Sequence, residues 1–429
     1  MSSDSALKAM TTGLEDVSRL NDQVTNAGVS EKNEQVAPLE VGLLTGGVDR
    51  PYALGLASAL LSRGVRLEFI GSDDLDSPQL RLEPQFTFLN LSGDQSESAG
   101  VVTKVWRVLR YYARLIRYAW CARPRVFHIL WNNKFDVFDR IALMLYYKLL
   151  GRKVVLTAHN VNAGKRDSHD SLINRLSLGV QYRLADHIFV HTETMKRELC
   201  DEFDVAPGVV SVISFGLNNS VADTELTTRQ AKQSLGIGND DRTILFFGHI
   251  GPYKGLEFLV TAFQQLAADQ HNYRLIIAGK SDPGCEGYWR EVEQAIRDDS
   301  SCDRVIQRIE FVPDAETEVY FKAADVLVLP YTHVSQSGVL RTGYRFGLPA
   351  IASDVGSFRE DIIEGRTGLL CKPGDPVDLA RVIAEYFRSD LFKELTTRRK
   401  EIREYADSHY SWDAVSRVTR TVYQELLGR

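Results

Sequence analysis

The chain has 429 residues, which at about 150 residues per domain predicts two or three domains and excludes one small module. Its 51 basic and 57 acidic residues give a formal net charge of −6, so a globally basic nucleic-acid-binding protein is not expected. The composition, with 44% hydrophobic and 25% charged residues, is that of an ordinary globular protein and excludes disorder of the whole chain.

Residues 1–37 are polar and rich in Ser, Asn and Glu, and we expect them to form a mobile tail. From there to residue 217, apolar strands alternate with amphipathic helices, which is typical of a parallel α/β domain. The expected strands are 39–45, 66–70, 126–130, 153–157, 187–190 and 210–213, and the expected helices include 51–63, 136–150 and 193–203.

The polar stretch 218–242, with a short helix at 228–235, is interpreted as a linker. The alternation then restarts in a second domain, 243–409, and a segment at 410–429 carries a last helix, 414–427, expected to pack back on the first domain. The expected strands of the second domain are 243–247, 273–278, 308–311, 326–329 and 350–353, and its expected helices are 256–268, 288–298, 316–324, 339–346 and 378–389. The pattern predicts two facing Rossmann-like, doubly wound domains with parallel sheets, which bind ligands at the carboxyl ends of their strands.

The cysteines are odd in number, lie far apart and form no CxxC pair: Cys121, Cys200, Cys285, Cys302 and Cys371. This pattern argues against a disulfide framework or a zinc module and fits a reducing cytoplasm. We expect each thiol to be a small buried hydrophobe. No apolar run reaches the roughly 18–20 residues of a spanning helix, and the first residues lack the pattern of a signal peptide, so we expect a cytoplasmic protein.

Three strand-to-helix loops carry residues suited to an anion. Gly46 and Gly47 follow the first strand, where backbone N–H groups at a helix start can face a phosphate, although an ordinary tight turn would look the same. The full GxGxxG fingerprint is absent there, which argues against a nicotinamide dinucleotide. Lys254, at the start of the helix after strand 243–247, adds a full positive charge, with a solvated lysine as the alternative.

The third loop, after strand 326–329, offers the N–H groups of Ser337, Gly338 and Val339, with Arg341 one turn into the helix. Capping alone would also explain Ser337 and Gly338. Two such helix starts in one domain favour a nucleotide diphosphate as ligand. His159 directly follows strand 153–157, where an imidazole can bind a sugar hydroxyl or move a proton, although a lone histidine is often structural.

The order of these segments resembles the retaining, nucleotide-sugar-dependent glycosyltransferases of family four, which have the two-domain GT-B fold. The resemblance covers nearly the whole chain after residue 38, and the Ser-Gln-Ser-Gly-Val-Leu loop is similar to that of bacterial enzymes that build exopolysaccharide or lipid-linked glycans. The segments that carry it are Gly46-Gly47, Thr157-Ala158-His159, Phe247-Gly248 through Lys254-Gly255, Ser335 through Leu340, Gly347-Leu348-Pro349, and Ala352 through Gly356 with Glu360.

The resemblance implies transfer of a hexose-type sugar from a nucleotide-diphosphate sugar to a lipid-linked saccharide acceptor, with retention, no metal and no further cofactor. It implies His159 and Lys254 as catalytic residues, with His159 at the transferred sugar. The implied diphosphate site is Gly46, Gly47, Lys254, Ser337, Gly338, Val339 and Arg341. The implied nucleotide site is Gly248, Gly279, Phe311, Val312 and Thr342. Donors preorganised at the leaving diphosphate act where charge develops in the transition state.

The chain departs from the family at two glutamates that commonly lie eight positions apart, since Val334 and Thr342 stand there. Arg341 or Arg345 could replace a missing charge. This departure keeps a catalytically silent GT-B scaffold open as an alternative, and a sugar-nucleotide epimerase is a second one.

A basic stripe is predicted on one face of a helix, because its members are spaced by 3, 3, 4 and 3 residues: Lys104, Arg107, Arg110, Arg114 and Arg117. Trp and Tyr residues lie between them, and no acid occurs from Lys104 to Arg125. A basic helix rich in Trp and Tyr favours an anionic membrane surface, here the inner face of the plasma membrane. The alternative is the solvated face of a packed helix, and nucleic acid is not an expected partner.

Overall fold

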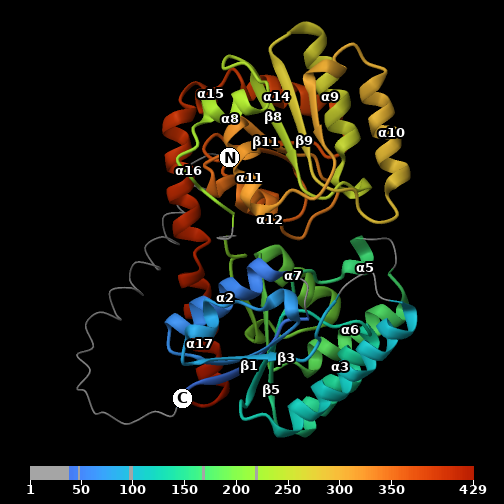
Figure 1. The fold of residues 1–429 in the computed structure, drawn as a ribbon, viewed down its shortest axis with the longest axis vertical. Helices are drawn as coiled ribbons and strands as arrows, with labels where there is room; N and C mark the ends of the chain where they lie inside the picture. Colours follow the sequence, from blue (N-terminus) through green and yellow to red (C-terminus); the bar gives the residue numbers. More distant parts are fainter. Residues whose placement is uncertain (1–37, 47–48, 96–99, 167–169, 218–220) are drawn as a thin grey trace, which may run out of the picture. The chain divides into compact units, whose positions relative to one another are not determined.

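The computed structural model describes residues 38–46, 49–95, 100–166, 170–217 and 221–429. The expected tail and Gly47 lie outside these residues. Residues 39–429 form one unit that contains two parallel sheets (Figure 1). No helix within the described ranges is both long and apolar enough to cross a bilayer.

The first sheet has the order β3-β2-β1-β4-β5-β6-β7, and all of its paired strands are parallel. Its strands are β1 (Glu40–Leu44), β2 (Arg66–Gly71), β3 (Phe86–Asn90), β4 (Val126–Ile129), β5 (Lys153–Thr157), β6 (His187–Val190) and β7 (Val210–Val212). The helices between them are α2 (Arg50–Ser62), α3 (Val101–Cys121), α4 (Met144–Leu149), α5 (Ala163–Arg166), α6 (Leu172–Leu184) and α7 (Glu193–Phe203), with short turns η1 (Asp73–Leu75), η2 (Leu80–Leu82), the π-helix η3 (Phe138–Leu143) and η4 (Pro207–Val209).

The second sheet has the order β10-β9-β8-β11-β12-β13 and is also parallel. Its strands are β8 (Arg242–Phe247), β9 (Tyr273–Ala278), β10 (Val305–Arg308), β11 (Val326–Leu329), β12 (Ala350–Ser353) and β13 (Gly368–Cys371). Its helices are α8 (Thr228–Ser234), η5 (Pro252–Lys254), α9 (Leu256–Asp269), α10 (Glu286–Arg297), η6 (Cys302–Arg304), α11 (Asp314–Ala323), α12 (Gly338–Arg345), α13 (Phe358–Asp361), α14 (Pro376–Tyr386), α15 (Asp390–Lys393) and α16 (Leu395–His409), and α17 (Trp412–Leu426) ends the chain. The two sheets confirm the predicted pair of Rossmann-like domains.

Each sheet is buried on both faces because helices cover it on both sides. In β8, Leu245 packs into one hydrophobic cluster, while Ile244 and Phe246 on either side of it pack into another. This is the period-two alternation of a strand. Near-continuous apolar strands such as Val326–Leu329 are therefore what a doubly covered parallel sheet requires.

The last two helices pack on different domains (Figure 1). Ile402 and Ala406 of α16 join a core cluster of the second domain, whereas Val415 and Tyr423 of α17 join a core cluster of the first. The chain passes between the domains at Trp412, whose Nε1 donates to the Leu217 carbonyl at 2.8 Å. The segment after residue 220 packs on the second domain, where Lys232 of α8 forms a buried ion pair with Asp325 at 2.9 Å.

Several elements differ from the sequence-based expectations. The strand expected at 308–311 is β10, Val305–Arg308, which pairs with β9 and leaves Phe311 71% exposed. β3, β13, α6 and α16 were not predicted as elements. The expectation that every cysteine is buried was wrong, since Cys371 is buried but Cys121 and Cys302 are exposed and Cys200 and Cys285 are half-buried. The other four lie on helix surfaces or in turns, where a small side chain need not be enclosed.

Candidate active site

A cavity of about 400 Å³ is lined by residues of both domains. Such a volume is in the range of small-molecule sites. The first domain contributes Asp49, Pro51 and Tyr52 from the start of α2. The second contributes residues that follow β8, β9, β10 and β11, so the cavity lies at the carboxyl ends of that sheet, where parallel sheets bind ligands.

Two glycines bring the ends of β8 and β9 into close contact. Gly248 has φ 105° and Gly279 has φ 149°, both in the region that favours glycine. A Cβ on Gly279 would lie 1.8 Å from the carbonyl oxygen of Gly248. Both line the cavity, so a ligand there meets backbone rather than side chains.

The N-terminus of α12 also faces the cavity. Ser337 is its N-cap and accepts a hydrogen bond from the Leu340 N–H at 3.3 Å, while Gly338 and Val339 line the cavity. The first N–H groups of a helix have no acceptor within the helix and carry its positive dipole end. Gln336 lines the cavity too, and its buried Oε1 has no hydrogen-bond partner among the described residues. This arrangement can receive an anion and one O–H or N–H donor.

Predicted nucleotide residues meet at this cavity. Gly248, Gly279, Phe311, Val312 and Thr342 all line it. The Thr342 hydroxyl donates to the Gly338 carbonyl at 3.1 Å, within its own helix. At the other position of the family's glutamates, Val334 is buried and packs against Gly356.

The predicted cations are not found among the described residues that line this cavity. The Lys254 side chain is buried, and its Nζ lies 3.9 Å from the centre of the Tyr331 ring, a cation–π contact. Arg341 is 2% exposed, donates to Asp361 at 2.6 Å and lies over the Tyr410 ring at 3.7 Å. These contacts hold the Arg341 guanidinium inside the second domain, where it pairs with Asp361.

Among the described residues that line the cavity, the one lysine is Lys280, and sequence reasoning missed it. It directly follows Gly279 after the end of β9, and its position just past a strand end is the signal that could have identified it. Beside it, His249 Nδ1 lies 2.8 Å from the Asp282 carboxylate. Two carboxylates also line the cavity and were missed, Asp49 and Asp314. Burial raises the pKa of Asp49, and the negative charge of Asp314 adds to this effect.

His159 belongs to an aromatic cluster behind Tyr52. Its ring stacks on Trp131 with centroids 4.0 Å apart and meets Tyr52 edge-on at 4.7 Å. Tyr52 lines the cavity, whereas His159 is not among the described lining residues. Gly46, in the loop after β1, has φ +63°, and a Cβ there would lie 2.7 Å from the Trp131 carbonyl oxygen.

The protonation of His159 follows from its neighbour His191. Nδ1 of His191 lies 3.0 Å from the Ile213 carbonyl oxygen, which only accepts, so this nitrogen carries the hydrogen. Burial lowers the pKa of His191 to about 4 and that of His159 well below its usual range, so both rings are neutral at pH 7. Nε2 of His191, 2.9 Å from Nδ1 of His159, therefore accepts, and Nε2 of His159 is left as an acceptor.

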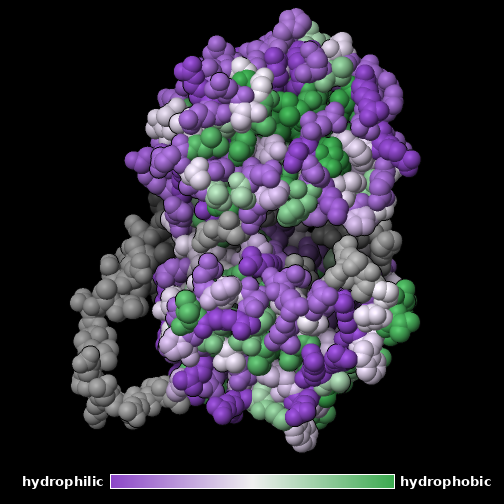
Figure 2. Space-filling model, in the orientation of Figure 1, coloured by the Kyte–Doolittle hydropathy of each residue, from purple (hydrophilic) through white to green (hydrophobic). Residues whose placement is uncertain are grey.

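The predicted basic stripe lies on α3. Lys104, Arg110, Arg114 and Arg117 are exposed and Arg107 is half-buried, donating to Asp94 at 2.9 Å. Exposed apolar side chains accompany them on this helix: Val101, Val102, Val105, Trp106, Leu109 and Trp120. Figure 2 shows hydrophobic atoms at the margin of the face where α3 begins. Among the described residues, no group of three or more His, Cys, Asp or Glu is arranged to hold a metal ion.

Two protein-family models match this chain, one in each domain. The family described as Glycosyltransferase Family 4 matches residues 45–220, and the one described as Glycosyl transferases group 1 matches residues 241–389. The chain belongs to glycosyltransferase family 4. The two matched segments correspond to the two sheet domains, and the gap between them contains α8.

Curated relatives are distant. An uncharacterised glycosyltransferase of Methanocaldococcus jannaschii is 27% identical over 249 residues, which are 56% of this chain and 60% of that protein. The D-inositol 3-phosphate glycosyltransferase of Corynebacterium efficiens is 25% identical over 282 residues, 63% of this chain and 65% of that protein. The chain thus spans somewhat less than two thirds of the length of these relatives.

Solved structures share the fold over nearly the whole chain. Sucrose-phosphate synthase of Thermosynechococcus elongatus has a TM-score of 0.73 at 19% identity and covers 91% of this chain and 99% of its own. HepE of Anabaena, in complex with UDP and glucose, has a TM-score of 0.69 at 16% identity and covers 90% of this chain and 100% of its own. These likenesses establish the two-domain GT-B fold.

Proposed function

We propose that this chain is a glycosyltransferase that uses a nucleoside-diphosphate sugar and binds it in the cavity between the two domains. The observation that carries the proposal is the convergence of the α12 N-terminus, the Gly248–Gly279 backbone contact and the exposed ring of Phe311 on one cavity. Each suits one part of such a donor, namely the diphosphate, the close approach of the ribose, and the base. The Anabaena neighbour solved with UDP-glucose supports this class of ligand.

In this proposal the diphosphate lies against Gly338 and Val339. When the bond between the anomeric carbon and the diphosphate oxygen breaks, negative charge grows on that oxygen, and preorganised N–H groups stabilise it without rearranging. The Lys280 ammonium adds positive charge at the cavity. Lys254 remains a predicted catalytic residue. Its ammonium would act either from its position over the Tyr331 ring or after the side chain moves away from that ring. No metal is required by this scheme.

The reaction proposed is transfer of a hexose-type sugar with retention. The acceptor hydroxyl forms the new bond to the anomeric carbon on the face that the diphosphate leaves, and its proton passes to the leaving diphosphate. His159 is proposed to contact the transferred sugar, because its buried Nε2 has no hydrogen-bond partner among the described residues; the contact requires Tyr52 to move aside. Tyr52, packed edge-on against His159, lies on the cavity side of it.

The family's missing glutamates leave the ribose without a carboxylate from α12. We infer that Asp314 accepts from the ribose hydroxyls instead, because it begins α11 two positions after Val312 and lines the same cavity as Phe311 and Val312. The same departure favours a second candidate, a catalytically silent scaffold. Detectable turnover would exclude that candidate.

The α3 stripe is proposed to attach the protein to an anionic membrane surface. Five basic side chains at roughly 1 kcal/mol each near such a surface would supply the attraction, and Trp106 and Trp120 would lie at the headgroups. A lipid-linked saccharide acceptor on that surface would then meet the first domain.

The test is a panel of UDP-, GDP- and ADP-sugars, read by melting temperature and by release of nucleoside diphosphate. We expect one donor to raise the melting temperature and to be slowly hydrolysed without acceptor. Asp314→Asn should weaken the binding of that donor. Asp303→Asn, which changes an exposed residue outside the cavity, should leave donor binding unchanged. The absence of stabilisation and hydrolysis with every donor would contradict the proposal.

A further inference from the structure

A second cavity, of about 690 Å³, lies wholly in the first domain. Gly46 follows β1, Ser72 follows β2, Ser92 follows β3 and Asn132 follows β4, and all four line it. One wall is the first half of α3. The cavity, which we call the α3 groove, therefore occupies the carboxyl ends of the parallel sheet, where such sheets bind ligands.

The α3 groove combines cationic and apolar side chains. Lys104, Arg107 and Lys134 line it, opposed by the one carboxylate of Asp74 among its described lining residues. Arg107 also pairs with Asp94 at 2.9 Å, so the lysines are the cations most open to a new anion.

The apolar part of the groove is unusually exposed. Val105, Leu109 and Phe135 line it and are 55%, 53% and 52% exposed. A groove for a soluble sugar would not need three large apolar side chains facing water beside two lysines. A molecule with an anionic group joined to a hydrocarbon chain matches both parts.

We propose that the α3 groove is the acceptor site and that the acceptor carries a phosphate joined to a lipid chain. The phosphate would lie at Lys104 and Lys134, and the first part of the chain along Val105, Leu109 and Phe135. This inference rests on the proposed glycosyltransferase function, and it names the chemistry of the acceptor and the place where it binds.

One residue that lines the groove lies three positions before a residue that lines the proposed donor cavity. Gly46 lines the groove, while Asp49, Pro51 and Tyr52 line the donor cavity. Consecutive Cα atoms are about 3.8 Å apart, so the Cα atoms of Gly46 and Asp49 lie within about 11 Å of each other. In this proposal a sugar held on the phosphate at Lys104 and Lys134 extends past Gly46 toward the donor, since all three residues line the same groove.

The wall formed by residues 132–135 is fixed before any ligand binds. The Asn133 N–H donates to Asp139 at 2.7 Å, the Tyr111 hydroxyl donates to Asn133 at 2.5 Å, and the Phe135 N–H donates to the Tyr112 hydroxyl at 3.0 Å. The Phe135 ring is stacked on that of Tyr112.

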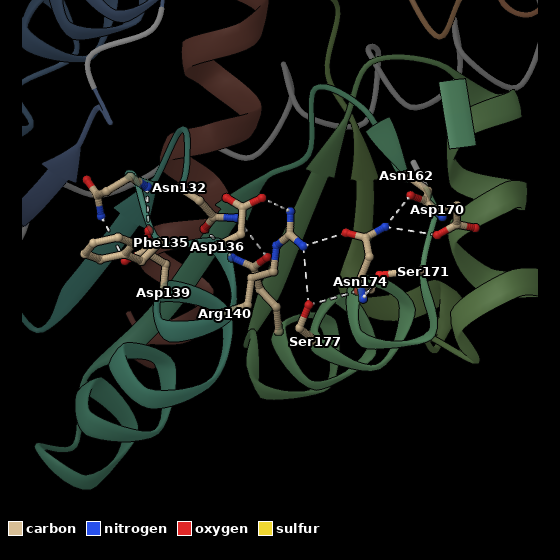
Figure 3. Close-up of polar contacts among 12 residues, drawn as sticks. Asn132, Phe135, Asp136, Asp139, Arg140, Asn162, Asp170, Ser171, Asn174 and Ser177 are labelled. Carbon is tan, nitrogen blue, oxygen red and sulfur yellow. Dashed lines mark hydrogen bonds and ion pairs between the residues drawn. The ribbon is translucent and has the colours of Figure 1, made fainter. Parts of the chain in front are cut away.

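A polar network ties this wall to α6 (Figure 3). Arg140, next to Asp139, donates to Asn174 at 2.8 Å and to Ser177 at 3.3 Å, both in α6, and pairs with Asp136 at 3.0 Å. A wall held in this way costs little ordering when the ligand binds.

Three soluble probes separate the parts of the proposed ligand. Decyl phosphate has both the anion and the chain, decyl glucoside has the same chain on an uncharged headgroup, and glycerol 3-phosphate has the anion without a chain. We expect calorimetry with the full-length protein, below the micellar concentrations, to show decyl phosphate binding at least tenfold more tightly than either other probe. Equal affinity for decyl phosphate and decyl glucoside would overturn the anionic part of the proposal, and equal affinity for decyl phosphate and glycerol 3-phosphate the lipid part.

Variants locate the binding. The double variant Lys104→Gln with Lys134→Gln should weaken the binding of decyl phosphate at least tenfold and leave the binding of decyl glucoside unchanged. Leu109→Ser should weaken the binding of both probes. Arg183→Gln removes an exposed cation of the same domain that lies in α6, outside the groove lining and outside the α3 stripe; it is the matched control and should change neither affinity. If the lysine pair has no larger effect than Arg183→Gln, the probe binds elsewhere and the proposal is wrong.

The donor assay keeps the two proposals apart. The groove variants should leave donor-induced stabilisation and donor hydrolysis unchanged, because none of these residues is among the described lining of the donor cavity. Donor hydrolysis without selective binding of decyl phosphate would refute the acceptor site alone. Selective binding of decyl phosphate without any donor activity would refute the proposed function.

Discussion

A carboxylate of the second domain contacts the first domain at the start of α7, and its removal should weaken this link between the domains. Glu360, in α13, accepts the backbone N–H of Glu193 at 2.9 Å and that of Thr194 at 2.8 Å, both at the N-terminus of α7. The Thr194 hydroxyl also donates to it. A negative charge at a helix N-terminus is stabilised by the helix dipole as well.

The perturbation is Glu360→Gln, which keeps the size of the side chain, removes the charge and leaves one oxygen able to accept. Hydrogen bonds to charged groups contribute about 1.5–3 kcal/mol and neutral ones about 0.5–1.5 kcal/mol. Because Glu360 is exposed, we take the lower end of each range, about 1.5 against 0.5 kcal/mol, and expect a loss of about 1 kcal/mol, which is about a fivefold change in an opening equilibrium.

Amide hydrogen exchange of Glu193 and Thr194 measures this equilibrium directly, because both amides must release Glu360 before they exchange. We expect their protection to fall about fivefold in Glu360→Gln. Glu364→Gln removes the same charge from an exposed residue four positions on, and should leave this protection unchanged. Unchanged protection of both amides in Glu360→Gln would refute the reasoning.

Three further predictions follow from the charges. Burial lowers the pKa of His191 to about 4 and that of His128 to about 3, so their contribution to the free energy of unfolding is complete above about pH 6.5 and is lost as the pH falls. Urea unfolding should show the free energy of unfolding falling by about 1.4 kcal/mol per pH unit for each histidine between about pH 6 and 4.5. His191→Gln should show a smaller slope. Lys254→Met should lower sugar transfer at least tenfold at saturating donor while the melting temperature changes by only a few degrees, and transfer equal to wild type would leave Lys254 a packing residue over Tyr331. Arg110→Glu, Arg114→Glu and Arg117→Glu together should weaken sedimentation with anionic vesicles about 100-fold and leave neutral vesicles unaffected, and equal binding would remove the membrane proposal.

The architecture could be predicted because strand ends and helix starts leave local signals. The alternation of apolar strands with helices fixes two parallel sheets, and the loop residues after each strand must meet at the carboxyl edge. Gly248, Gly279, Gly338 and Val339 reach one cavity for this reason. Phe311 also reaches it, although the strand expected there ends at Arg308, because a residue just past a strand is left exposed at that edge.

The charged part of the site could not be predicted because side-chain surroundings come from distant segments. Arg341 looks like an anion ligand in its loop, but Asp361 and Tyr410 enclose it from 20 and 69 positions further along the chain. In the same way Tyr331 covers Lys254 from another strand end. A periodic pattern gives the position of a charge on an element but does not give the neighbours that neutralise it.

Described residues of two chain crossings between the domains, Leu217 and Trp412, line the proposed donor cavity. Leu217 in the first crossing receives the Trp412 Nε1–H and donates its own N–H to the Tyr410 carbonyl at 3.2 Å in the second. The Trp412 ring occupies the space that a Cβ on Gly55 or Gly216 would need, and it lines the cavity. Trp412 therefore ties both crossings to the wall of this cavity, and the contact of Glu360 with the N-terminus of α7 is a separate link between the two domains.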